Sequence, residues 1–539
     1  MTRSKKKRMN AAIAAVLSLG LLAAGCSTAD NNPPSNAPDN NTSHNSGDPG
    51  AAELKLSYWV ALPGDSARLM SNYNDSLFYQ ELEKRTGVSV EFQHPAVGSA
   101  PEQFNLLIAS GNLPDVIETN ITTYPGGPEK AIADRVALPL NDLIESHAPN
   151  LKKYLDDNPA ITKEISTDSG TIYAFPAIGV GNSNASSGMV LRKDWLDELG
   201  LEKPETIDEW TTVLRAFKEQ KGASSPLTLT LGELKDDRLI GAWNMGNRFY
   251  LDNGTVKYGP YEPAYKEFLT QMNAWYEEGL LDPDFSTQDN QAKDAKITNS
   301  HTGAFVAFIG GGIGKYLNAI PESAPSFDLV ATQHPVLDKG NEPTVFVAAY
   351  DYRGDGSAII TPDNKNPEAT VEWFDYLYSE EGNILKTFGV EGTTYEMVDG
   401  SPIYTDLITN NPEGLSVGEA MSKYLRVSAP APGFVGDDRY TQQYYKFDQQ
   451  KEAVEIFNKY YSNLENTRMP RITHTADEAQ EISSIMAEIE TYKDEMLLRF
   501  VMGVEPLENF DRYIAQLQSM RIERVLELSQ AALERYNNR

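Results

Sequence analysis

Hydrophobic and polar positions alternate at the start of the globular part of the sequence and then give way to helical spacing. Leu54 to Val60 alternates apolar with polar residues over most of its length, the pattern of a half-buried strand. Residues 76–86 and 101–110 have helical patterns, each closed by a glycine. Further strands are predicted at 88–92 and 113–117. Strands and helices that alternate at this spacing predict parallel pairing in an α/β fold.

Two later helices have well-defined starts. Thr206 is followed three residues later by Glu209, which predicts a capping box, and Thr475 with Glu478 predicts another. The helix after Thr206 carries one apolar stripe, formed by Ile207, Trp210, Val213, Leu214 and Phe217. Its residues alone favour a well-packed surface helix and indicate no function.

The N-terminus has the organisation of an export signal. Residues 2–8 carry five basic side chains, and an apolar run follows from 11 to 24. That run is shorter than the roughly 20 apolar residues a membrane span needs, so a secretory signal peptide is predicted for 1–25. The next residue, Cys26, is the single cysteine of the chain, so no disulfide is expected. Residues 27–52 are almost all small or polar and predict a disordered tether.

Charge and length restrict the class of protein. The net charge is −30 at pH 7, and removal of the five N-terminal cations makes it more negative, which opposes nucleic-acid binding. The remaining length exceeds what one hydrophobic core usually serves, so two lobes are expected. Aromatic residues make up 10% of the chain, with 27 tyrosines, which is compatible with surfaces that stack on sugar rings.

The order of several short motifs resembles the extracellular solute-binding proteins, the capture subunits of ABC importers for sugars. The first motifs are 173–176 (Tyr-Ala-Phe-Pro), 192–196 (Arg-Lys-Asp-Trp-Leu) and 204–210 (Pro-Glu-Thr-Ile-Asp-Glu-Trp). The run 389–396 is similar to the third lobe crossover of that family, and 500–507 is similar to the C-terminal part of large oligosaccharide-binding lipoproteins of Gram-positive bacteria. The resemblance extends from Cys26 to the end of the chain.

The resemblance implies a two-lobe, type II periplasmic-binding-protein-like α/β fold with a ligand cleft between the lobes. The expected organisation is a signal peptide at 1–25, a lipidated Cys26 with a tether to residue 52, a first lobe from 53–175 plus about 335–390, and a second lobe from 176–334 plus about 391–539. Leu22 to Cys26 resembles a lipobox, with leucine one place earlier than usual. The implied partners are an oligosaccharide and membrane permease subunits, with the protein a monomer held at the outer face of the membrane.

Candidate ligand-binding residues come from strand ends and from glycine-rich loops. In open α/β sheets ligands bind beyond the carboxyl ends of strands, which nominates Trp59, Asn120 and Tyr124. Family resemblance places a stacking aromatic near Trp243. The complete set of candidates is Trp59, Asn120, Tyr124, Trp243, Arg248, Tyr350, Tyr352, Arg353 and Tyr395. An arginine that lines the cleft would favour an acidic sugar such as a uronate.

The sequence carries no recognisable motif of catalysis or of metal binding. The six histidines are scattered without zinc-ligand spacing, and no Gly-x-Ser-x-Gly elbow is found. The glycines at 310–314 lack the Lys-Ser/Thr ending of a phosphate loop and predict a turn at a strand end. Residues 221–226, where some relatives carry a calcium loop, hold no acidic ligand, and 351–356 lacks the closing glutamate of an EF-hand. No cofactor and no obligatory metal are therefore expected.

Two other functions stay open. One is a surface glycoside hydrolase or lyase, against which the absence of a recognisable catalytic motif argues. The other is a peptide-binding or sensory lipoprotein on the same fold, because function resides in sites grafted onto folds.

Overall fold

The structure is a computed structural model of the 539-residue chain, and it describes residues 54–180, 185–320, 324–344, 346, 352–427 and 431–539. The chain divides into two compact units, Met1–Ala52 and Glu53–Arg539. Cys26 and the segments predicted to be a signal peptide and a tether lie outside the described residues.

The first sheet has six strands in the order β14-β4-β11-β3-β1-β2. β1 pairs in parallel with both β2 and β3, as the alternating sequence pattern predicts, although β3 begins three residues later than expected. β11 is antiparallel to β3 and to β4 and lies between them. The strands are β1 (Leu54–Val60), β2 (Val88–Gln93), β3 (Val116–Glu118), β4 (Phe175–Gly179), β11 (Tyr352–Ile360) and β14 (Gly433–Val435).

The second sheet has four strands in the order β10-β5-β9-β6. β5 is antiparallel to β10 and β9, whereas β6 is parallel to β9. Two hairpins, β7-β8 and β12-β13, stand apart from both sheets. These strands are β5 (Ser187–Arg192), β6 (Leu227–Thr228), β7 (Phe249–Asp252), β8 (Thr255–Tyr258), β9 (Ala304–Phe308), β10 (Leu329–Ala331), β12 (Tyr395–Val398) and β13 (Ser401–Tyr404).

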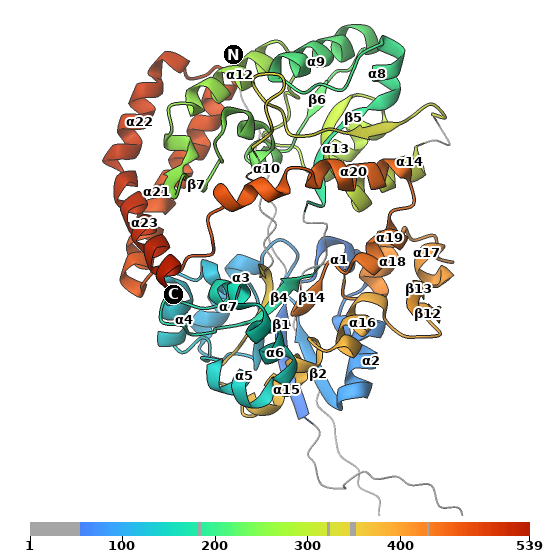
Figure 1. Cartoon of the computed structure of the whole chain (residues 1–539), viewed down its shortest axis with the longest axis vertical. Helices are drawn as coiled ribbons and strands as arrows, with labels where there is room; N and C mark the ends of the chain where they lie inside the picture. The colour runs from blue at the N-terminus through green and yellow to red at the C-terminus, as the bar shows by residue number, and fades with distance from the viewer. Residues whose placement is uncertain (1–53, 181–184, 321–323, 345, 347–351, 428–430) are drawn as a thin grey trace, which may run out of the picture. The chain divides into compact units, whose positions relative to one another are not determined.

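Helices cover both sheets, and each sheet has its own hydrophobic core (Figure 1). The first core contains residues of α2 (Leu77–Thr86), α5 (Asn141–His147), α6 (Pro149–Asp157) and α15 (Pro367–Tyr376). The second contains residues of α8 (Lys193–Leu199), α9 (Ile207–Lys221), α12 (Tyr265–Glu277), α21 (Ala476–Val501), α22 (Phe510–Ser519) and α23 (Ile522–Asn538). The fold is therefore of the predicted α/β class, with sheets flanked by helices.

The remaining helices are short or peripheral. They are α1 (Gly64–Leu69), α3 (Ala100–Ser110), α4 (Gly127–Ala133), α7 (Pro159–Glu164), α10 (Leu231–Leu234), α11 (Asp237–Ile240), α13 (Asn290–Thr298), α14 (Lys315–Ala319), α16 (Glu380–Phe388), α17 (Asp406–Thr409), α18 (Val417–Tyr424), α19 (Asp438–Tyr444) and α20 (Asp448–Asn458). Short 3₁₀ turns include η2 (Ile121–Thr123) and η3 (Gly241–Trp243), and η5 (Ile309–Gly314) is a π-helical turn.

Both predicted capping boxes are present. The Glu209 backbone N–H donates to the Thr206 hydroxyl over 3.1 Å, and the Thr206 N–H donates back to the Glu209 carboxylate over 3.2 Å. The same reciprocal pair joins Thr475 and Glu478 at the start of α21. Each box satisfies two backbone donors that a helix start otherwise leaves without partners. The apolar stripe of α9 is buried, as its spacing predicts.

The C-terminal helix α23 contacts the turn that precedes β4 of the first sheet. The Arg535 guanidinium donates to Oδ2 of Asp168 over 2.5 Å, and that of Arg539 donates to the Ser166 carbonyl over 3.0 Å. In Figure 1, α21, α22 and α23 form one edge of the unit beside α12. The C-terminal segment is thus bonded to the turn that precedes β4 as well as packed into the second core.

The run 389–396, where the third crossover is predicted, follows directly after α16. The Thr394 hydroxyl donates to the Phe388 carbonyl over 2.6 Å and accepts from the Val390 N–H over 2.7 Å, so this segment folds back on the end of α16. The chain then returns to the first sheet, where β14 is parallel to β4. The first sheet therefore includes a strand that comes later in the chain than the predicted boundary near 391, and the lobe boundaries stay a prediction. The glycines at 310–314 lie at the end of β9 as expected, in the π-helical turn that leads into α14.

Candidate functional site

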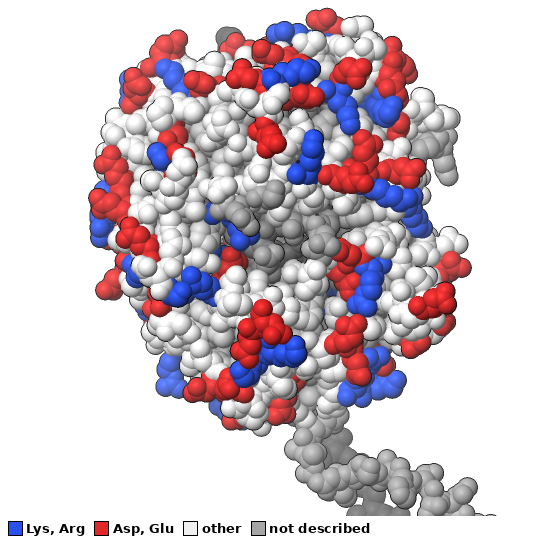
Figure 2. Space-filling view, viewed as in Figure 1, with Lys and Arg blue, Asp and Glu red and all other residues white. Residues whose placement is uncertain are grey.

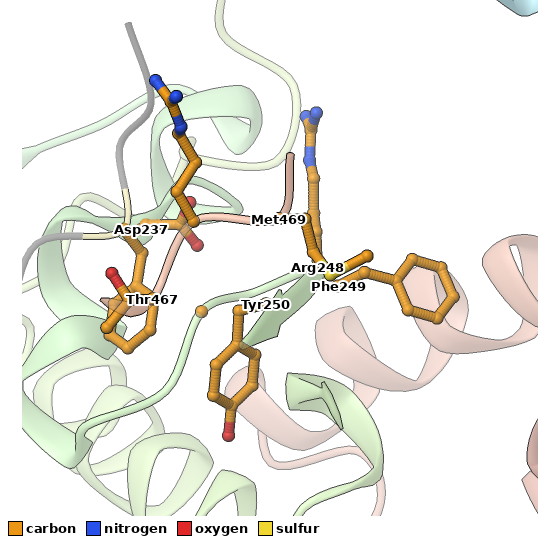
Figure 3. Close-up of a pocket in the computed structure, with 9 residues that line it drawn as sticks. Asp237, Arg248, Phe249, Tyr250, Thr467 and Met469 are labelled. Atoms are coloured by element: carbon orange, nitrogen blue, oxygen red, sulfur yellow. The ribbon is translucent and has the colours of Figure 1, made fainter. Parts of the chain in front are cut away.

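A small pocket of about 30 Å³ opens beside the β7–β8 hairpin (Figure 3). Three parts of the chain that are distant in sequence form it: α11 with the loop that leads into β7, a single residue of the return from β10 to β11, and the segment before α21. Its lining consists of Asp237, Gly246, Arg248, Phe249, Tyr250, Phe346, Thr467, Arg468 and Met469.

Hydrogen bonds fasten the loop before β7 to α11. The Asn247 backbone N–H donates to Oδ1 of Asp237 over 2.5 Å, and the Asn247 side-chain amide donates to the Lys235 carbonyl over 2.6 Å. A Cβ on Gly259 would lie 1.7 Å from the Gly246 carbonyl oxygen, so only glycine allows the end of β8 to pass this close to the loop. The loop is therefore held from two sides, which fixes the position of Arg248 at its end.

Aromatic rings and one glycine form the apolar part of the pocket. The rings of Tyr250 and Phe346 meet edge to face, with centroids 5.2 Å apart and an interplanar angle of 82°. A Cβ on Gly246 would lie 3.2 Å from Cδ1 of Phe346 and 3.5 Å from Oδ1 of Asp237. The absence of a side chain at Gly246 thus leaves room between the ring and the carboxylate. Met469 adds a flexible apolar wall on the side of α21.

The charged side chains of the pocket, Asp237, Arg248 and Arg468, differ in their hydrogen-bond partners. Burial raises the pKa of the Asp237 carboxyl, while the N–H of Asn247 and the charge of Arg248 act in the opposite direction. Arg248 is exposed and makes no hydrogen bond or ion pair with a described residue. Arg468 donates to Oε1 of Glu164, at the end of α7, over 3.3 Å. In Figure 3 the Arg248 guanidinium points away from the Tyr250 ring, at the rim of the pocket.

Arg238, the residue after Asp237 on α11, links this helix to the second sheet. Arg238 is buried, forms an ion pair with Asp236, and donates to the Ser187 hydroxyl at the start of β5 over 2.6 Å. The ring of His334 bonds through Nδ1 to the Arg238 carbonyl over 3.2 Å. Burial raises the pKa of the Asp236 carboxyl to about 6. Arg238 therefore joins α11 to the second sheet and holds the pocket on a rigid element.

Three of the predicted site residues lie at or just after the carboxyl ends of two paired strands: Trp59 near the end of β1, and Asn120 and Tyr124 after β3. The Trp59 ring is 6% exposed and packs against Phe104, with centroids 6.1 Å apart. The Asn120 side chain accepts hydrogen bonds from both the backbone N–H and the hydroxyl of Thr122, at the start of η2. The partly exposed Tyr124 donates to Oδ2 of Asp134 over 3.0 Å. Burial, together with that hydrogen bond, raises the pKa of the Tyr124 phenol to about 12. Trp59 and Tyr124 share one hydrophobic cluster, and the ligand role of all three residues stays a prediction.

The other described candidates do not join that group. Trp243 lies in η3, is 8% exposed, and packs edge to face on Phe268 with centroids 5.6 Å apart. Most of its ring is therefore in the second core. Tyr395 starts the β12-β13 hairpin and packs against Phe388, in a hydrophobic cluster separate from those of Trp59 and Trp243. Arg248 is the candidate that lines the pocket.

The remaining candidates are Cys26, Tyr350, Tyr352 and Arg353. Tyr350 and Cys26 are outside the described residues. Tyr352 and Arg353 belong to β11, where they pair with Ile178 and Ala177 of β4, which places them at the edge where the chain enters the first sheet from β10. Their roles also stay predictions.

Several residues of the pocket were not predicted from the sequence. Asp237, Phe346 and the segment 467–469 come from regions without a strong pattern, and only the fold brings them to Arg248. Phe308 was also missed: it is 63% exposed at the carboxyl end of β9, opposite Ser187 of β5. Phe308 could have been predicted from the sequence, because an aromatic residue at a strand end next to glycines is a candidate stacking residue in this class of sheet.

Metal and membrane features are limited within the described part of the chain. There, no group of three or more His, Cys, Asp or Glu side chains is arranged to hold a metal ion. One acidic cluster, Asp282 with Asp284, instead surrounds the Lys296 ammonium at 2.7 to 2.9 Å. In the residues that were searched, no helix combines the length and apolar character that a bilayer crossing requires.

Two α/β sheets, each flanked by helices and joined by repeated crossings, define a type II periplasmic-binding-protein-like fold. The chain belongs to the bacterial extracellular solute-binding proteins, a family whose profile matches residues 72–384, more than half of its length. The resemblance found in the sequence motifs is thereby confirmed, and the family consists of binding proteins that act outside the cell.

Individual relatives cover most of the chain. The fructooligosaccharide ABC transporter substrate-binding protein FusA of Streptococcus pneumoniae serotype 4 is 26% identical over 493 residues, 86% of this chain and 87% of that protein. The polygalacturonan/rhamnogalacturonan-binding protein YtcQ of Bacillus subtilis is 23% identical over 410 residues, 71% and 73% of the two chains. The crystal structure of the alginate-binding protein AlgQ2 superposes with a TM-score of 0.75 at 25% identity, covering 89% of this chain and 98% of that one.

Proposed function

We propose that this protein captures an oligosaccharide outside the cell and delivers it to the permease of an ABC importer. Family membership over residues 72–384 carries this proposal, because the family binds solutes and its relatives FusA and YtcQ are named for saccharides.

Ligand recognition would combine stacking with hydrogen bonds to hydroxyl groups. The proposed contact residues remain Trp59, Asn120, Tyr124, Trp243, Arg248, Tyr350, Tyr352, Arg353 and Tyr395. Among them, Arg248 has the strongest structural support, because it lines a pocket and its guanidinium has no hydrogen-bond partner among the described residues. Trp59 and Trp243 would need to expose more of their rings when a ligand binds.

The mature protein would be attached to the outer face of the cell membrane through a lipidated Cys26. Residues 27–52 would then serve as a tether about 30 Å long on average as a random coil. The folded unit would act as a monomer that closes its two lobes on the ligand, and the permease would recognise the closed state. No catalytic step is proposed.

A thermal-shift screen of the purified protein against oligosaccharides and short peptides tests this function. A ligand at 100 times its dissociation constant adds about 2.7 kcal/mol to the free energy of unfolding, which is measurable. A shift with a saccharide, without turnover in product analysis, is the expected result. Turnover would favour the hydrolase or lyase alternative, and a shift with peptides alone would favour the peptide-binding alternative.

A further inference from the structure

We propose that the C-terminal part of α23 forms a releasable clasp between the two halves of the fold and restricts their relative motion. Each half is one of the two sheets with its own hydrophobic core. The clasp consists of Arg535 and Arg539 on one side and of the turn at 166–170, which leads into β4, on the other. It goes beyond the proposed function, because it does not depend on which ligand the protein binds.

The two sides of the clasp belong to different cores. Ile522 and Val525 of α23 are part of the second core, whereas Ile165 and Ile172, which flank the turn, are part of the first. The chain itself crosses between the sheets from β4 to β5, from β10 to β11, and from β14 to α20, which packs on the second sheet. The clasp adds a connection that is not covalent and can therefore be released.

The turn at 166–170 is held firmly on the side of the first sheet. The Thr167 N–H donates to the Thr171 carbonyl over 2.9 Å. The Asn141 side-chain amide, at the start of α5, donates to the Gly170 carbonyl over 2.9 Å. Asp168 thus lies on a fixed turn, and its side chain is only 9% exposed.

Arg535 joins this turn to two helices of the second half. Its Nε donates to Oδ2 of Asp168 over 2.5 Å. Its Nη1 and Nη2 donate to the two carboxylate oxygens of Glu478, at the start of α21, over 3.1 and 2.5 Å. The Thr473 hydroxyl donates to the other oxygen of Asp168 over 3.1 Å. The bidentate pair with Glu478 orients the guanidinium, so that its third donor is directed at Asp168.

Two further arginines extend the contact along the same edge. Nη1 of Arg539 donates to the carbonyls of Ser166 and Thr167 over 3.0 and 2.5 Å. Arg468, in the segment before α21, donates to Oε1 of Glu164 at the end of α7 over 3.3 Å. In Figure 1 the C-terminal end of α23 lies next to α7. Charged side chains and backbone carbonyls thus make these contacts.

The polar character of the clasp makes it releasable. Polar interfaces within a chain generally allow relative motion, and partly exposed ion pairs add little stability. Nε and Nη2 of Arg539 are buried without a hydrogen-bond partner among the described residues, a cost that release would remove. Acidic and basic side chains are interspersed over the face shown in Figure 2, so ion pairs alone are not distinctive. The clasp is distinctive because its partners belong to different cores.

Pulsed electron paramagnetic resonance on the purified full-length chain measures the distance between the halves. Spin labels are attached to cysteines introduced by Glu368→Cys on α15, in the first half, and by Glu219→Cys on α9, in the second. Both side chains are exposed, and Cys26→Ser removes the native cysteine. The distance distribution is recorded without added saccharide, for the unmodified clasp and for three variants that remain cooperatively folded.

The variants are Arg535→Gln/Arg539→Gln, Asp168→Asn and Arg524→Gln. The last is the matched control. Arg524 also lies on α23, but its ion pairs are with Glu481 of α21 and Glu527 of α23, which both belong to the second half. Loss of a surface arginine from α23 is therefore common to the control and the test, whereas contact with the turn at 166–170 is lost only in the test.

The unmodified clasp should give one narrow distribution at about 0.1 M salt. Arg535→Gln/Arg539→Gln should add a broader, displaced component, because loss of charge-assisted hydrogen bonds reduces the ratio of clasped to released molecules by at least about tenfold. Asp168→Asn should act in the same direction but less strongly, since it leaves the bonds of Arg539 to backbone carbonyls in place. Arg524→Gln should leave the distribution unchanged. At about 1 M salt, screening should broaden the distribution of the unmodified protein.

Other outcomes overturn the inference. If the folded double variant gives the same distribution as the unmodified protein, or if Arg524→Gln broadens it equally, the contacts with the turn do not restrict motion. If the double variant fails to fold, Asp168→Asn and the unmodified protein at about 1 M salt decide, and an unchanged distribution in both contradicts the clasp. A broad distribution in the unmodified protein at low salt would show that the clasp does not hold the halves.

Discussion

The Arg426 guanidinium donates a hydrogen bond of 2.7 Å to Oε1 of Glu118, and the two side chains are 4% and 5% exposed. Glu118 ends β3, whereas Arg426 follows α18 more than 300 residues later in the chain. Glu118 also accepts a hydrogen bond of 2.9 Å from the Tyr58 phenol of β1. This buried pair therefore attaches the segment that leads to β14 to the centre of the first sheet.

Removal of one partner should destabilise the protein strongly. Arg426→Met leaves the Glu118 carboxylate buried without its counter-charge, a change that typically costs about 3–5 kcal/mol. Urea denaturation followed by circular dichroism measures the loss. The control is Lys55→Met, which removes the exposed pair with Glu91, and we expect it to leave the midpoint unchanged. Equal midpoints for Arg426→Met and the unmodified protein would show that the pair does not support the fold.

The capping box of α9 gives a second stability prediction. Thr206→Ala removes the hydroxyl that accepts the Glu209 N–H, and we expect a loss of about 1 kcal/mol in the free energy of unfolding. Thr212→Ala, on the exposed side of the same helix, is the matched control and should be close to neutral. The prediction fails if both substitutions shift the denaturation midpoint by the same amount.

The sequence predicted those features that depend on local patterns. Strand alternation at Leu54–Val60 and the capping boxes at Thr206 and Thr475 are properties of a few adjacent residues, and the structure has them all. The site depends on long-range contacts instead. Phe346 and Arg468 reach the pocket through the paths of chain segments that no local periodicity encodes.

The course of the chain after 389–396 also depends on long-range contacts. A motif that is similar to a family crossover does not show whether the chain leaves the lobe at once. Here Thr394 bonds back to the end of α16, and the return strand β14 comes about 40 residues later, too short for its periodicity to be recognised. Of the candidate ligand residues, the exposure of Arg248 could be predicted because polar residues in a glycine-rich loop are seldom core, whereas the burial of Trp243 could not.

The ring of His334 should make the folded protein less stable in acid. Burial, with a smaller contribution from the charge of Arg238, lowers the pKa of the His334 ring from 6.5 to about 4. Between pH 6.5 and about 4, the His334 ring is therefore protonated in the unfolded chain but neutral in the folded protein. The free energy of unfolding is at its full value above pH 6.5 and decreases as the pH falls toward 4. Because the ring is partly exposed, we expect a loss on the order of 1–2 kcal/mol over this interval.

Denaturation midpoints between pH 7 and 4 measure that loss. His334→Gln keeps a donor for the Arg238 carbonyl and cannot be protonated, so it should reduce the dependence on pH. Part of the dependence should remain, because burial also lowers the pKa of His94 and of His474. A dependence unchanged by His334→Gln would contradict the assignment.

Filling the pocket should weaken ligand binding more than it weakens the fold. In Gly246→Val, the branched side chain would occupy the space between Phe346 and Asp237, where even a Cβ comes within 3.2 to 3.5 Å. We expect the affinity for the oligosaccharide, measured by calorimetry, to fall by at least about tenfold. The measurement requires that the variant still shows cooperative thermal unfolding. Gly64→Ala is the control, because a Cβ there meets no atom within 4 Å. Full affinity in Gly246→Val would place the ligand elsewhere.

The central claim is that this protein binds an oligosaccharide and does not transform it. The most direct measurement is calorimetric titration of the purified protein with the saccharide that gives the largest thermal shift, followed by chromatographic analysis of the recovered sugar. The account predicts one ligand per chain, saturable binding and an intact oligosaccharide at the end of the titration. Cleaved sugar, or the absence of saturable binding across acidic and neutral oligosaccharides, would contradict it.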